Sequence, residues 1–314
     1  MSPAKQRVEI DGRTLSVSNL EKVLFPEVGF TKAQVIDYYV RIAPVLLPHV
    51  AGRPVTFTRW PDGVEGQTFF EKNSARHAPG WVRSVTIPSP GSSRGRETLD
   101  MVVLESVADL AWAANLAALE VHVPQWRVDD DGVPQLPDLL VLDLDPGPDT
   151  GIYECCLVAE RLGERLEADG LDPVVKTSGS KGMQVYAPIE APTDREHPSR
   201  YAKALAQELS AETPDDVVWR MEKVLRPGKV LIDWSQNNPA KTTVAPYSLR
   251  ARAGATVSTP IGWDEVDAVR DGSLDPAELR FTTDQVLARV EEYGDLFDVA
   301  GATRAALPEV REGR

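Results

Sequence analysis

The chain has 314 residues, 42% of them hydrophobic, and a formal net charge of −14. This length and composition allow a substantial buried core, as in one large α/β domain or two closely packed lobes. The negative charge argues against a protein that coats nucleic acid by electrostatic attraction. Because no segment is apolar enough for a signal peptide or a membrane span, we expect a cytoplasmic protein with no membrane partner.

Two segments carry the Ser/Thr-x-x-Gln/Asp pattern of a capping box, which marks the start of a helix. The first, at 31–34, predicts a helix that continues towards Pro44. The second, at 106–109, predicts an alanine-rich helix that ends at about Leu119. The strand-like stretches between these two helices are 55–59 and 82–87.

The second half of the chain also interleaves strands and helices. Besides the two strands described below, the expected elements are strands near 174–177 and 184–188, helices near 151–168 and 198–211, and an acidic helical stretch from about 264. This interleaving predicts the α/β class with a mixed β-sheet. We expect one domain over 1–300, built of two packed lobes, and a C-terminal tail over 301–314.

Two aspartates one residue apart close an apolar run, Asp-Leu-Leu-Val-Leu-Asp-Leu-Asp-Pro, and these are Asp143 and Asp145. Side chains alternate between the faces of a strand, so the leucines can enter a core while both carboxylates project from the other face. Adjacent like charges are unfavourable unless a cation neutralises them, and Mg²⁺ and Mn²⁺ prefer carboxylate oxygens. The pair indicates a metal site; the alternative is an acidic strand end before the Pro-Gly-Pro turn at 146–148.

A third carboxylate, Asp233, lies in another alternating segment, Lys-Val-Leu-Ile-Asp-Trp-Ser-Gln at 229–236. Three carboxylates on strands can hold two metal ions about 4 Å apart, an arrangement that stabilises both the attacking and the leaving oxygen in phosphoryl and nucleotidyl transfer. Taken alone, an aspartate in such a segment more often belongs to a structural ion pair, and this alternative stays open.

A basic strip runs from Arg220 to Arg252. It holds seven basic residues and two acidic ones, a local charge of +5, which leaves −19 for the rest of the chain. Positive charge concentrated beside a candidate metal ligand suits a polyphosphate or a nucleic-acid backbone. The alternative is a solvated charged face.

Three smaller patterns are compatible with nucleotide or nucleic-acid binding. A Ser-Gly-Ser-Lys-Gly segment offers the hydroxyl of Ser178 and the cation of Lys181 to phosphate oxygens, although it is too short for a Walker A loop and also fits an ordinary glycine turn. His122 follows the alanine-rich helix, and a lone histidine often has a structural role. Phe69 and Phe70 taken by themselves favour a pair in the core; because adjacent strand residues face opposite ways, the alternative is that one ring is exposed and stacks on a base.

Taken together and in this order, these segments resemble the polymerase domain of bacterial ligase D, the non-homologous end-joining enzyme, and its relatives in the archaeo-eukaryotic primase superfamily. The resemblance runs from about residue 8 to about residue 297, and it implies an archaeo-eukaryotic primase-like catalytic fold. Its most specific parts are Leu-Asp-Leu-Asp-Pro-Gly at 142–147, Thr-Ser-Gly-Ser-Lys-Gly at 177–182, Ile-Asp-Trp-Ser-Gln-Asn at 232–237 and Thr-Thr-Val-Ala-Pro-Tyr-Ser-Leu-Arg-Ala-Arg at 242–252.

The resemblance implies a template-directed nucleotidyl transferase in which Asp143, Asp145 and Asp233 hold two catalytic Mn²⁺ or Mg²⁺ ions. Lys22 and Lys32 match the pair that grips the 5′-phosphate across a DNA gap. The aromatic residues that stack at the template bend are matched by Phe69 and Phe70. The residues carried over to the incoming NTP or dNTP are His122, Ser178, Lys181, Arg226, Gln236, Arg250 and Arg252.

The family further implies a preference for ribonucleotides, and we expect a monomer that fills short gaps in gapped or broken DNA during repair or end joining. One position departs from the pattern, because Gln184 stands where close relatives have a histidine. Glutamine forms hydrogen bonds but does not titrate near neutral pH, so a proton-transfer role of that histidine does not carry over. Since the chain shows no ligase or nuclease motif, we expect a separate DNA ligase as partner and a place at the nucleoid.

Two other functions stay open on the sequence. Metal-dependent phosphohydrolases of the haloacid dehalogenase type also use Asp-x-Asp, but they follow it with a small or hydroxyl residue where this chain has Pro146. A catalytically silent DNA-end-binding module would use Lys22, Lys32 and the basic strip, yet it would not need three carboxylates. Primer extension with Mn²⁺ separates these functions.

Overall fold

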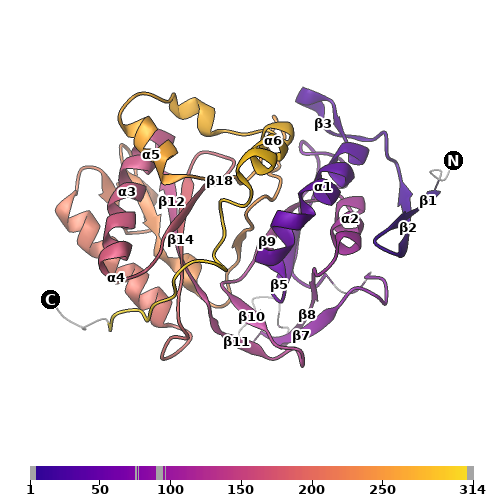
Figure 1. Ribbon diagram of the computed structural model, residues 1–314, viewed down its shortest axis with the longest axis horizontal. Helices are drawn as coiled ribbons and strands as arrows, with labels where there is room; N and C mark the ends of the chain where they lie inside the picture. Colours follow the sequence, from indigo (N-terminus) through magenta and orange to yellow (C-terminus); the bar gives the residue numbers. More distant parts are fainter. Residues whose placement is uncertain (1–4, 75, 77, 90–94, 96, 310–314) are drawn as a thin grey trace. The chain divides into compact units, whose positions relative to one another are not determined.

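The computed structural model describes residues 5–74, 76, 78–89, 95 and 97–309. The chain divides into two compact units, each assembled from segments that are far apart in the sequence (Figure 1). Unit 1 comprises Met1–Pro134, Thr243–Ser258 and Thr282–Gly294, and unit 2 comprises Gln135–Thr242, Thr259–Phe281 and Asp295–Arg314. Within the part of the chain that the structure describes, no helix is long and apolar enough to cross a membrane.

Unit 1 is built on a sheet with the strand order β17-β9-β5-β8-β7, in which all neighbours are antiparallel and β6 also pairs with β5. Strands β1 and β2 form a separate hairpin, as do β3 and β4. The elements of unit 1 are β1 (Lys5–Ile10), β2 (Arg13–Ser18), β3 (Val23–Phe25), β4 (Phe30–Thr31), α1 (Lys32–Val50), β5 (Pro54–Arg59), β6 (Phe69–Glu71), β7 (Ser84–Pro88), β8 (Thr98–Val103), α2 (Val107–Asn115), β9 (Ala118–Val123), β10 (Trp126–Val128), β17 (Thr243–Val244) and α6 (Thr283–Tyr293).

Both predicted capping boxes are present. At the start of α1 the Thr31 hydroxyl accepts a hydrogen bond from the Gln34 backbone N–H at 3.4 Å, and the Gln34 side chain accepts one from the Thr31 N–H at 2.8 Å. The helix continues past Pro44 to Val50, further than predicted. Two prolines, Pro44 and Pro48, lie inside the helix, and each removes one backbone hydrogen bond. Here the burial of an apolar face that includes Leu46 and Val50 outweighs these losses.

Helix α2 ends earlier than predicted. Its last residue is Asn115, and β9 already begins at Ala118, so Leu119 lies on a strand. Ala117 has a φ of 56°, in the left-handed region that ends helices. An alanine gives no sign of this conformation in the sequence, because alanine is the best helix former.

Unit 2 is built on a mixed sheet with the strand order β15-β16-β12-β14-β13-β18. Only β15 and β16 are parallel among its pairs, so the predicted mixed sheet is confirmed. Helices α3 and α4 pack against this sheet (Figure 1). The elements of unit 2 are β11 (Pro134–Pro137, at the boundary between the units), β12 (Leu139–Pro146), α3 (Ile152–Ala168), β13 (Val174–Thr177), β14 (Met183–Pro188), α4 (His197–Glu212), β15 (Val217–Val218), β16 (Val230–Asp233), β18 (Pro260–Ile261) and α5 (Trp263–Arg270).

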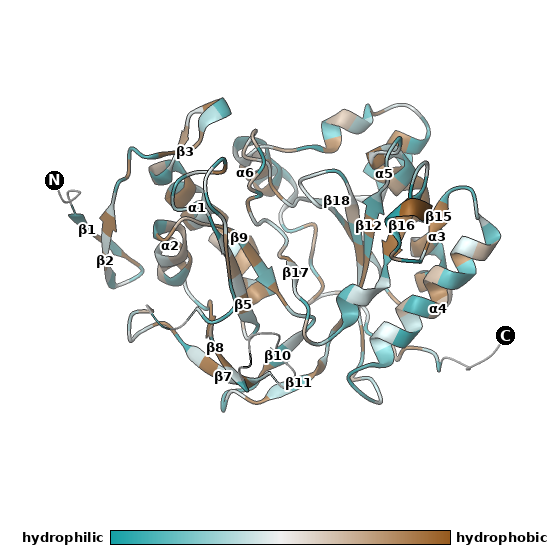
Figure 2. Cartoon of the chain, turned by 180° about the vertical axis from the view of Figure 1, so that it is seen from behind, coloured by the Kyte–Doolittle hydropathy of each residue, from teal (hydrophilic) through white to brown (hydrophobic). Residues whose placement is uncertain are grey.

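Hydrophobic side chains mark the inner side of the α4 helix. Its buried residues Tyr201, Leu205 and Leu209 recur every four residues, and Figure 2 shows the matching alternation of hydrophobic and hydrophilic colour along the helix. The same logic applies to β12, where Leu140, Leu142 and Leu144 are fully buried. The alternate residues of β12 are thereby left for the other face of the sheet.

Residues 295–309 run along unit 2. The Glu190 N–H donates to the Ala305 carbonyl at 3.0 Å, and the His197 ring lies 3.1 Å from the Pro308 carbonyl. Phe297 packs edge-on against Tyr186, with the ring centroids 5.1 Å apart. The described part of the segment predicted as a tail is therefore tied to unit 2 by hydrogen bonds, and residues 310–314 lie outside the described residues.

Candidate functional site

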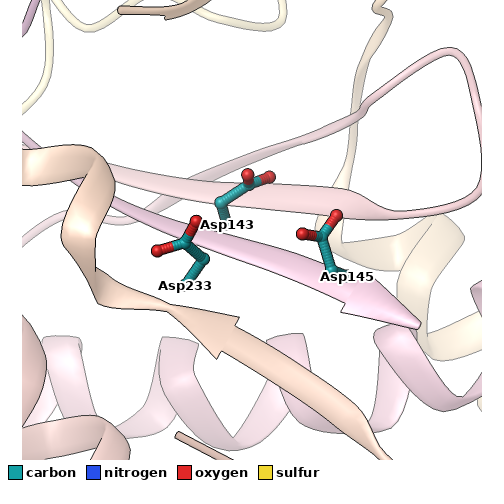
Figure 3. A group of neighbouring side chains, drawn as sticks. All are labelled: Asp143, Asp145 and Asp233. Atoms are coloured by element: carbon teal, nitrogen blue, oxygen red, sulfur yellow. The ribbon is translucent and has the colours of Figure 1, made fainter. Parts of the chain in front are cut away.

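Three carboxylates converge on one face of the unit 2 sheet. Asp143 and Asp145 project from β12, and Asp233 lies at the end of the neighbouring strand β16 (Figure 3). In the antiparallel register between these strands, Asp143 is directly opposite Asp233. Each residue offers one carboxylate oxygen such that these oxygens lie within 4.8 Å of one another. The structure thus brings together the three aspartates that the alternation of apolar residues singled out.

Two glycines hold the end of β12 in place. A Cβ on Gly147 would lie 1.9 Å from the Arg226 carbonyl oxygen, and a Cβ on Gly182 would lie 2.0 Å from the Leu144 carbonyl oxygen. Real Cβ atoms essentially never come so close to a non-bonded atom, so neither position accepts a side chain without a backbone shift. The Gly147 N–H also donates to the Lys229 carbonyl at 2.9 Å. The motifs around the aspartates and in the glycine loop therefore contain glycine because backbone packs directly on the strand.

Electrostatics make this cluster unfavourable as it stands. Asp233 is buried, Asp143 is half-buried and Asp145 is exposed. Burial and the charge of Asp145, followed by that of Asp233, raise the pKa of Asp143 to about 7. A divalent cation would neutralise the crowded charges, and three carboxylates are the hard oxygen donors that Mg²⁺ and Mn²⁺ take. The donor set therefore fits the expected metal.

Neighbouring polar side chains hold two of the three carboxylates. Gln184 donates from Nε2 to Asp143 Oδ1 at 2.9 Å, and Gln236 donates from Nε2 to Asp233 Oδ2 at 2.8 Å. The Ser235 backbone N–H donates to Asp233 Oδ1 at 3.0 Å, and Lys241 contacts the Ser235 hydroxyl. Gln236 was expected beside the nucleotide; in this structure it contacts a carboxylate of the cluster.

The glycine loop lies between β13 and β14. The Ser178 hydroxyl accepts hydrogen bonds from the N–H groups of Ser180 and Gly182, each at 3.2 Å, which closes the loop on itself. Gly179 has a φ of 66°, which the tight turn requires. Lys181 is exposed at the tip. Outside this loop, Arg226 of unit 2 donates from Nη2 to the Met221 carbonyl at 2.8 Å.

A second cluster of predicted residues lies in unit 1 around Glu120, which the sequence analysis did not single out. Glu120 and His122 share one face of β9, and Glu120 accepts from Arg250 Nε and His122 Nε2, both at 3.0 Å, and from the Ala251 N–H at 3.1 Å. Burial alone would raise the pKa of Glu120, but the hydrogen bond from His122 and the charge of Arg250 outweigh it and lower the pKa to about 2. Glu120 therefore stays ionised and fixes two candidate nucleotide-binding residues.

The predicted stacking residues lie on the short strand β6. Both rings are exposed, Phe69 by 41% and Phe70 by 52%, so the interpretation of this pair as core residues is wrong. The Phe70 ring lies edge-on to His122, with the ring centroids 6.4 Å apart. Arg252, another candidate nucleotide-binding residue of unit 1, is exposed.

The two candidate phosphate-binding lysines are neighbours. The Lys32 backbone N–H donates to the Lys22 carbonyl at 2.8 Å. Lys22 Nζ forms an ion pair with Asp62 at 2.8 Å, and Lys32 Nζ donates to the Ser18 carbonyl at 2.8 Å. Burial, together with the positive charge of Lys22, lowers the pKa of Lys32 to about 8. Asp62 is a further residue that the sequence analysis missed, since 40 residues separate it from Lys22.

Comparison with known proteins identifies the family. The model of the LigD primase-polymerase domain matches residues 31–297. The chain belongs to the LigD primase-polymerase domain family. This is a family of nucleotidyltransferases, and the predicted primase-like fold is confirmed by a solved structure, the polymerase domain from Mycobacterium tuberculosis ligase D in complex with DNA. That structure has a TM-score of 0.84 and 40% identity, and the match covers 92% of this chain and 99% of that one.

Two curated relatives extend the comparison to whole LigD proteins. The multifunctional non-homologous end joining protein LigD of Mycolicibacterium smegmatis is 43% identical over 280 residues, which are 89% of this chain and 35% of that protein. The bifunctional non-homologous end joining protein LigD of Bacillus subtilis is 31% identical over 89% of this chain and 43% of that protein. The chain thus spans less than half the length of these relatives.

Proposed function

We propose that this chain is a template-directed polymerase that adds nucleotides, preferentially ribonucleotides, into short DNA gaps that carry a 5′-phosphate, during repair or end joining. The observation that carries the proposal is the meeting of Asp143, Asp145 and Asp233 on adjacent strands, within 4.8 Å of one another. Membership of the LigD primase-polymerase family supports the same chemistry. The end-joining names of the curated relatives support a role with broken DNA.

In this proposal the three aspartates would hold two Mn²⁺ or Mg²⁺ ions. Bound ions would stabilise charge on the attacking and the leaving oxygen of the transfer. The carboxylates bind them best when all three are ionised, which the raised pKa of Asp143 places at neutral pH and above in the absence of metal. Strand register fixes their spacing before any substrate arrives, so little reorganisation accompanies binding.

The other candidate residues divide by the kind of phosphate they would meet. Lys181 lies on a closed glycine loop, where the exposed ammonium group suits the triphosphate of an incoming nucleotide. Glu120 fixes Arg250 by charge-assisted hydrogen bonding, which would hold this cation in a defined place for an anionic substrate. The candidate nucleotide contacts also include His122, Ser178, Arg226, Gln236 and Arg252.

Lys22 and Lys32 would bind the 5′-phosphate on the far side of the gap. Burial, and after it the positive charge of Lys22, lowers the pKa of Lys32, and a doubly charged phosphate would offset both effects. Phe69 and Phe70 present exposed rings on which a template base can stack. These contacts would give preference for a gap over intact duplex.

Extension on gapped DNA tests the proposal. The substrates are a gap with and without a 5′-phosphate, supplied with ribonucleotides or deoxyribonucleotides and with Mn²⁺ or Mg²⁺. We expect templated addition that is faster with ribonucleotides and stronger on the phosphorylated gap. Binding to the gap without any addition would instead identify a catalytically silent end-binding module, and nucleotide hydrolysis without addition would identify a phosphohydrolase.

A further inference from the structure

Four polar side chains form a row across four neighbouring strands of unit 2. In the antiparallel registers, Lys176 of β13 is opposite Gln184 of β14, Gln184 is opposite Asp143 of β12, and Asp143 is opposite Asp233 of β16. Lys176 is fully buried and Gln184 is 4% exposed. A buried lysine and a buried amide next to a carboxylate cluster cost free energy unless they are hydrogen-bonded, so their contacts need an account.

The contacts fix the direction of the amide. Lys176 Nζ lies 2.5 Å from Gln184 Oε1, and Gln184 Nε2 lies 2.9 Å from Asp143 Oδ1. An ammonium group only donates hydrogen bonds, and a carboxylate only accepts them. An amide between the two satisfies both neighbours in one orientation alone, with its oxygen on the lysine and its N–H on the aspartate. Lys176, together with the Tyr186 hydroxyl, which donates to the same oxygen at 3.4 Å, therefore prevents the side chain of Gln184 from turning over.

The amide also keeps the lysine charge at a distance. An ammonium group bonded directly to Asp143 would form an ion pair and compete with a cation for that carboxylate. With Gln184 between them, Asp143 receives a neutral donor that is polarised by the charge behind it. Because glutamine does not titrate near neutral pH, this donor is the same at every pH at which the protein works.

We propose that Gln184, anchored by Lys176, is a positioning residue of the metal centre that holds Asp143 Oδ1 and thereby orients the carboxylate towards a bound cation. The inference rests on the proposed function, since it concerns the same carboxylates. Partners that orient metal ligands are worth about 10- to 100-fold in metal affinity or activity when they are removed. The row thus extends the site two strands beyond its ligands.

The test uses the whole chain and titrates it with MnCl₂ alone, following heat release or the loss of the free Mn²⁺ signal in electron paramagnetic resonance. Gln184→Met keeps the length of the side chain and removes its donor. We expect the Mn²⁺ dissociation constant to rise about 10-fold or more. In primer extension, kcat should fall by a similar factor while KM for the nucleotide changes little.

The double variant Lys176→Met, Gln184→Met separates positioning from a structural role. Gln184→Met alone removes the oxygen that accepts from the buried Lys176 ammonium group and is expected to lower stability, whereas replacement of both side chains by apolar groups of similar shape restores most of it. If the pair only stabilised the fold, Mn²⁺ affinity would return to the wild-type value together with the stability. Positioning predicts that the double variant folds as the wild type does and still binds Mn²⁺ weakly.

Two controls complete the test. Tyr201 lies on α4, and its hydroxyl donates a 2.6 Å hydrogen bond to Asp169. Tyr201→Phe removes this bond and should leave Mn²⁺ affinity unchanged. Asp233→Ala removes a proposed ligand and should abolish binding. Wild-type affinity in the folded Gln184 variants would overturn the positioning role while Asp233→Ala still reports a metal site. Failure of the wild type itself to bind Mn²⁺ would overturn the proposed function and this inference with it.

Discussion

Asp143 and Asp233 stand directly opposite each other in the antiparallel register of β12 and β16, although 90 residues separate them in the sequence. Removal of either carboxylate leaves the sheet intact but breaks the cluster. We expect Asp233→Ala to abolish nucleotide addition, because transition-state charge is no longer neutralised, while binding to gapped DNA is retained. Primer extension and fluorescence anisotropy measure the two properties. The exposed acid Asp215 offers a matched control, and Asp215→Ala should leave both unchanged.

The raised pKa of Asp143 predicts that the metal-free protein loses stability with rising pH. A carboxyl group whose folded-state pKa is raised from 3.8 to about 7 contributes stability that is complete below its unfolded pKa and lost as pH rises through about 7. In the presence of a chelator, the denaturation midpoint of the wild type should therefore decrease as the pH is raised from about 4 to about 8. Asp143→Asn should make this decrease smaller. Added Mn²⁺ should stabilise the wild type more at pH 8 than at pH 6. A midpoint that rises with pH in chelator would contradict the assignment.

Glu120 should be required for both stability and nucleotide affinity. Its side chain is 10% exposed and that of Arg250 14%, so Glu120→Ala breaks a largely buried ion pair, with an expected loss of about 3 to 5 kcal/mol in the free energy of unfolding. Because the pKa of Glu120 is lowered to about 2, its stabilising contribution is present above pH 4.5 and lost as pH falls towards 2.

The milder variant Glu120→Gln tests the functional part of this prediction. It keeps the shape of the side chain and weakens the hold on Arg250 and His122, so KM for the nucleotide should rise more than kcat falls. Urea denaturation and steady-state extension measure the two effects. Glu105→Gln is the control. The Glu105 side chain is 43% exposed and forms an ion pair with Arg83, so this variant should change stability by less than about 1 kcal/mol. Equal effects of the two variants would refute a special role of Glu120.

Lys22 and Lys32 should confer selectivity for a 5′-phosphate. The double variant Lys22→Ala, Lys32→Ala should weaken binding to a phosphorylated gap far more than to an unphosphorylated one, because hydrogen bonds between charged groups are stronger than those to a hydroxyl. Asp62→Asn removes the carboxylate that now pairs with Lys22 and should strengthen binding to the phosphorylated gap. Equal losses on both substrates in the double variant would show that the lysines do not contact that phosphate.

The pH dependence of this selectivity provides an independent check. The pKa of Lys32 is lowered to about 8, so its ammonium group is present below that pH and lost above it. The ratio of affinities for phosphorylated and unphosphorylated gaps should fall as pH rises through about 8. Lys32→Arg should extend the selectivity to higher pH, since arginine stays protonated. A ratio that is constant from pH 7 to pH 9 would exclude Lys32 as the phosphate ligand.

The sequence predicted those parts of the fold that depend on local pattern. Alternation of leucine and aspartate in β12 placed Asp143 and Asp145 on one face, and the capping box at Thr31 predicted the start of α1. Both follow from the chemistry of neighbouring residues. The left-handed conformation of Ala117, which ends α2 early, has no such local signal because tertiary structure imposes it.

The missed residues of the candidate site have partners that are remote in the chain. Glu120 and Arg250 are 130 positions apart, and the role of Lys176 emerges only through the register of three strands. The alternation in Leu-Glu-Val-His could have indicated that Glu120 and His122 share a face of one strand. It could not have indicated that the guanidinium group of a distant segment would contact them, because the local sequence of a segment does not determine which distant segment packs beside it.

The close packing of Gly147 and Gly182 on the end of β12 has an energetic consequence. The backbone around Gly147 and Gly182 is packed too closely to admit a Cβ, so little room is left for a backbone shift that would move the carboxylates of Asp143 and Asp145 apart. The two carboxylates therefore stay close together and repel each other, whereas in a more flexible protein they could move apart. A bound cation would neutralise this repulsion. Part of the affinity for metal is thereby stored in the rigidity of two turns that carry no ligand themselves.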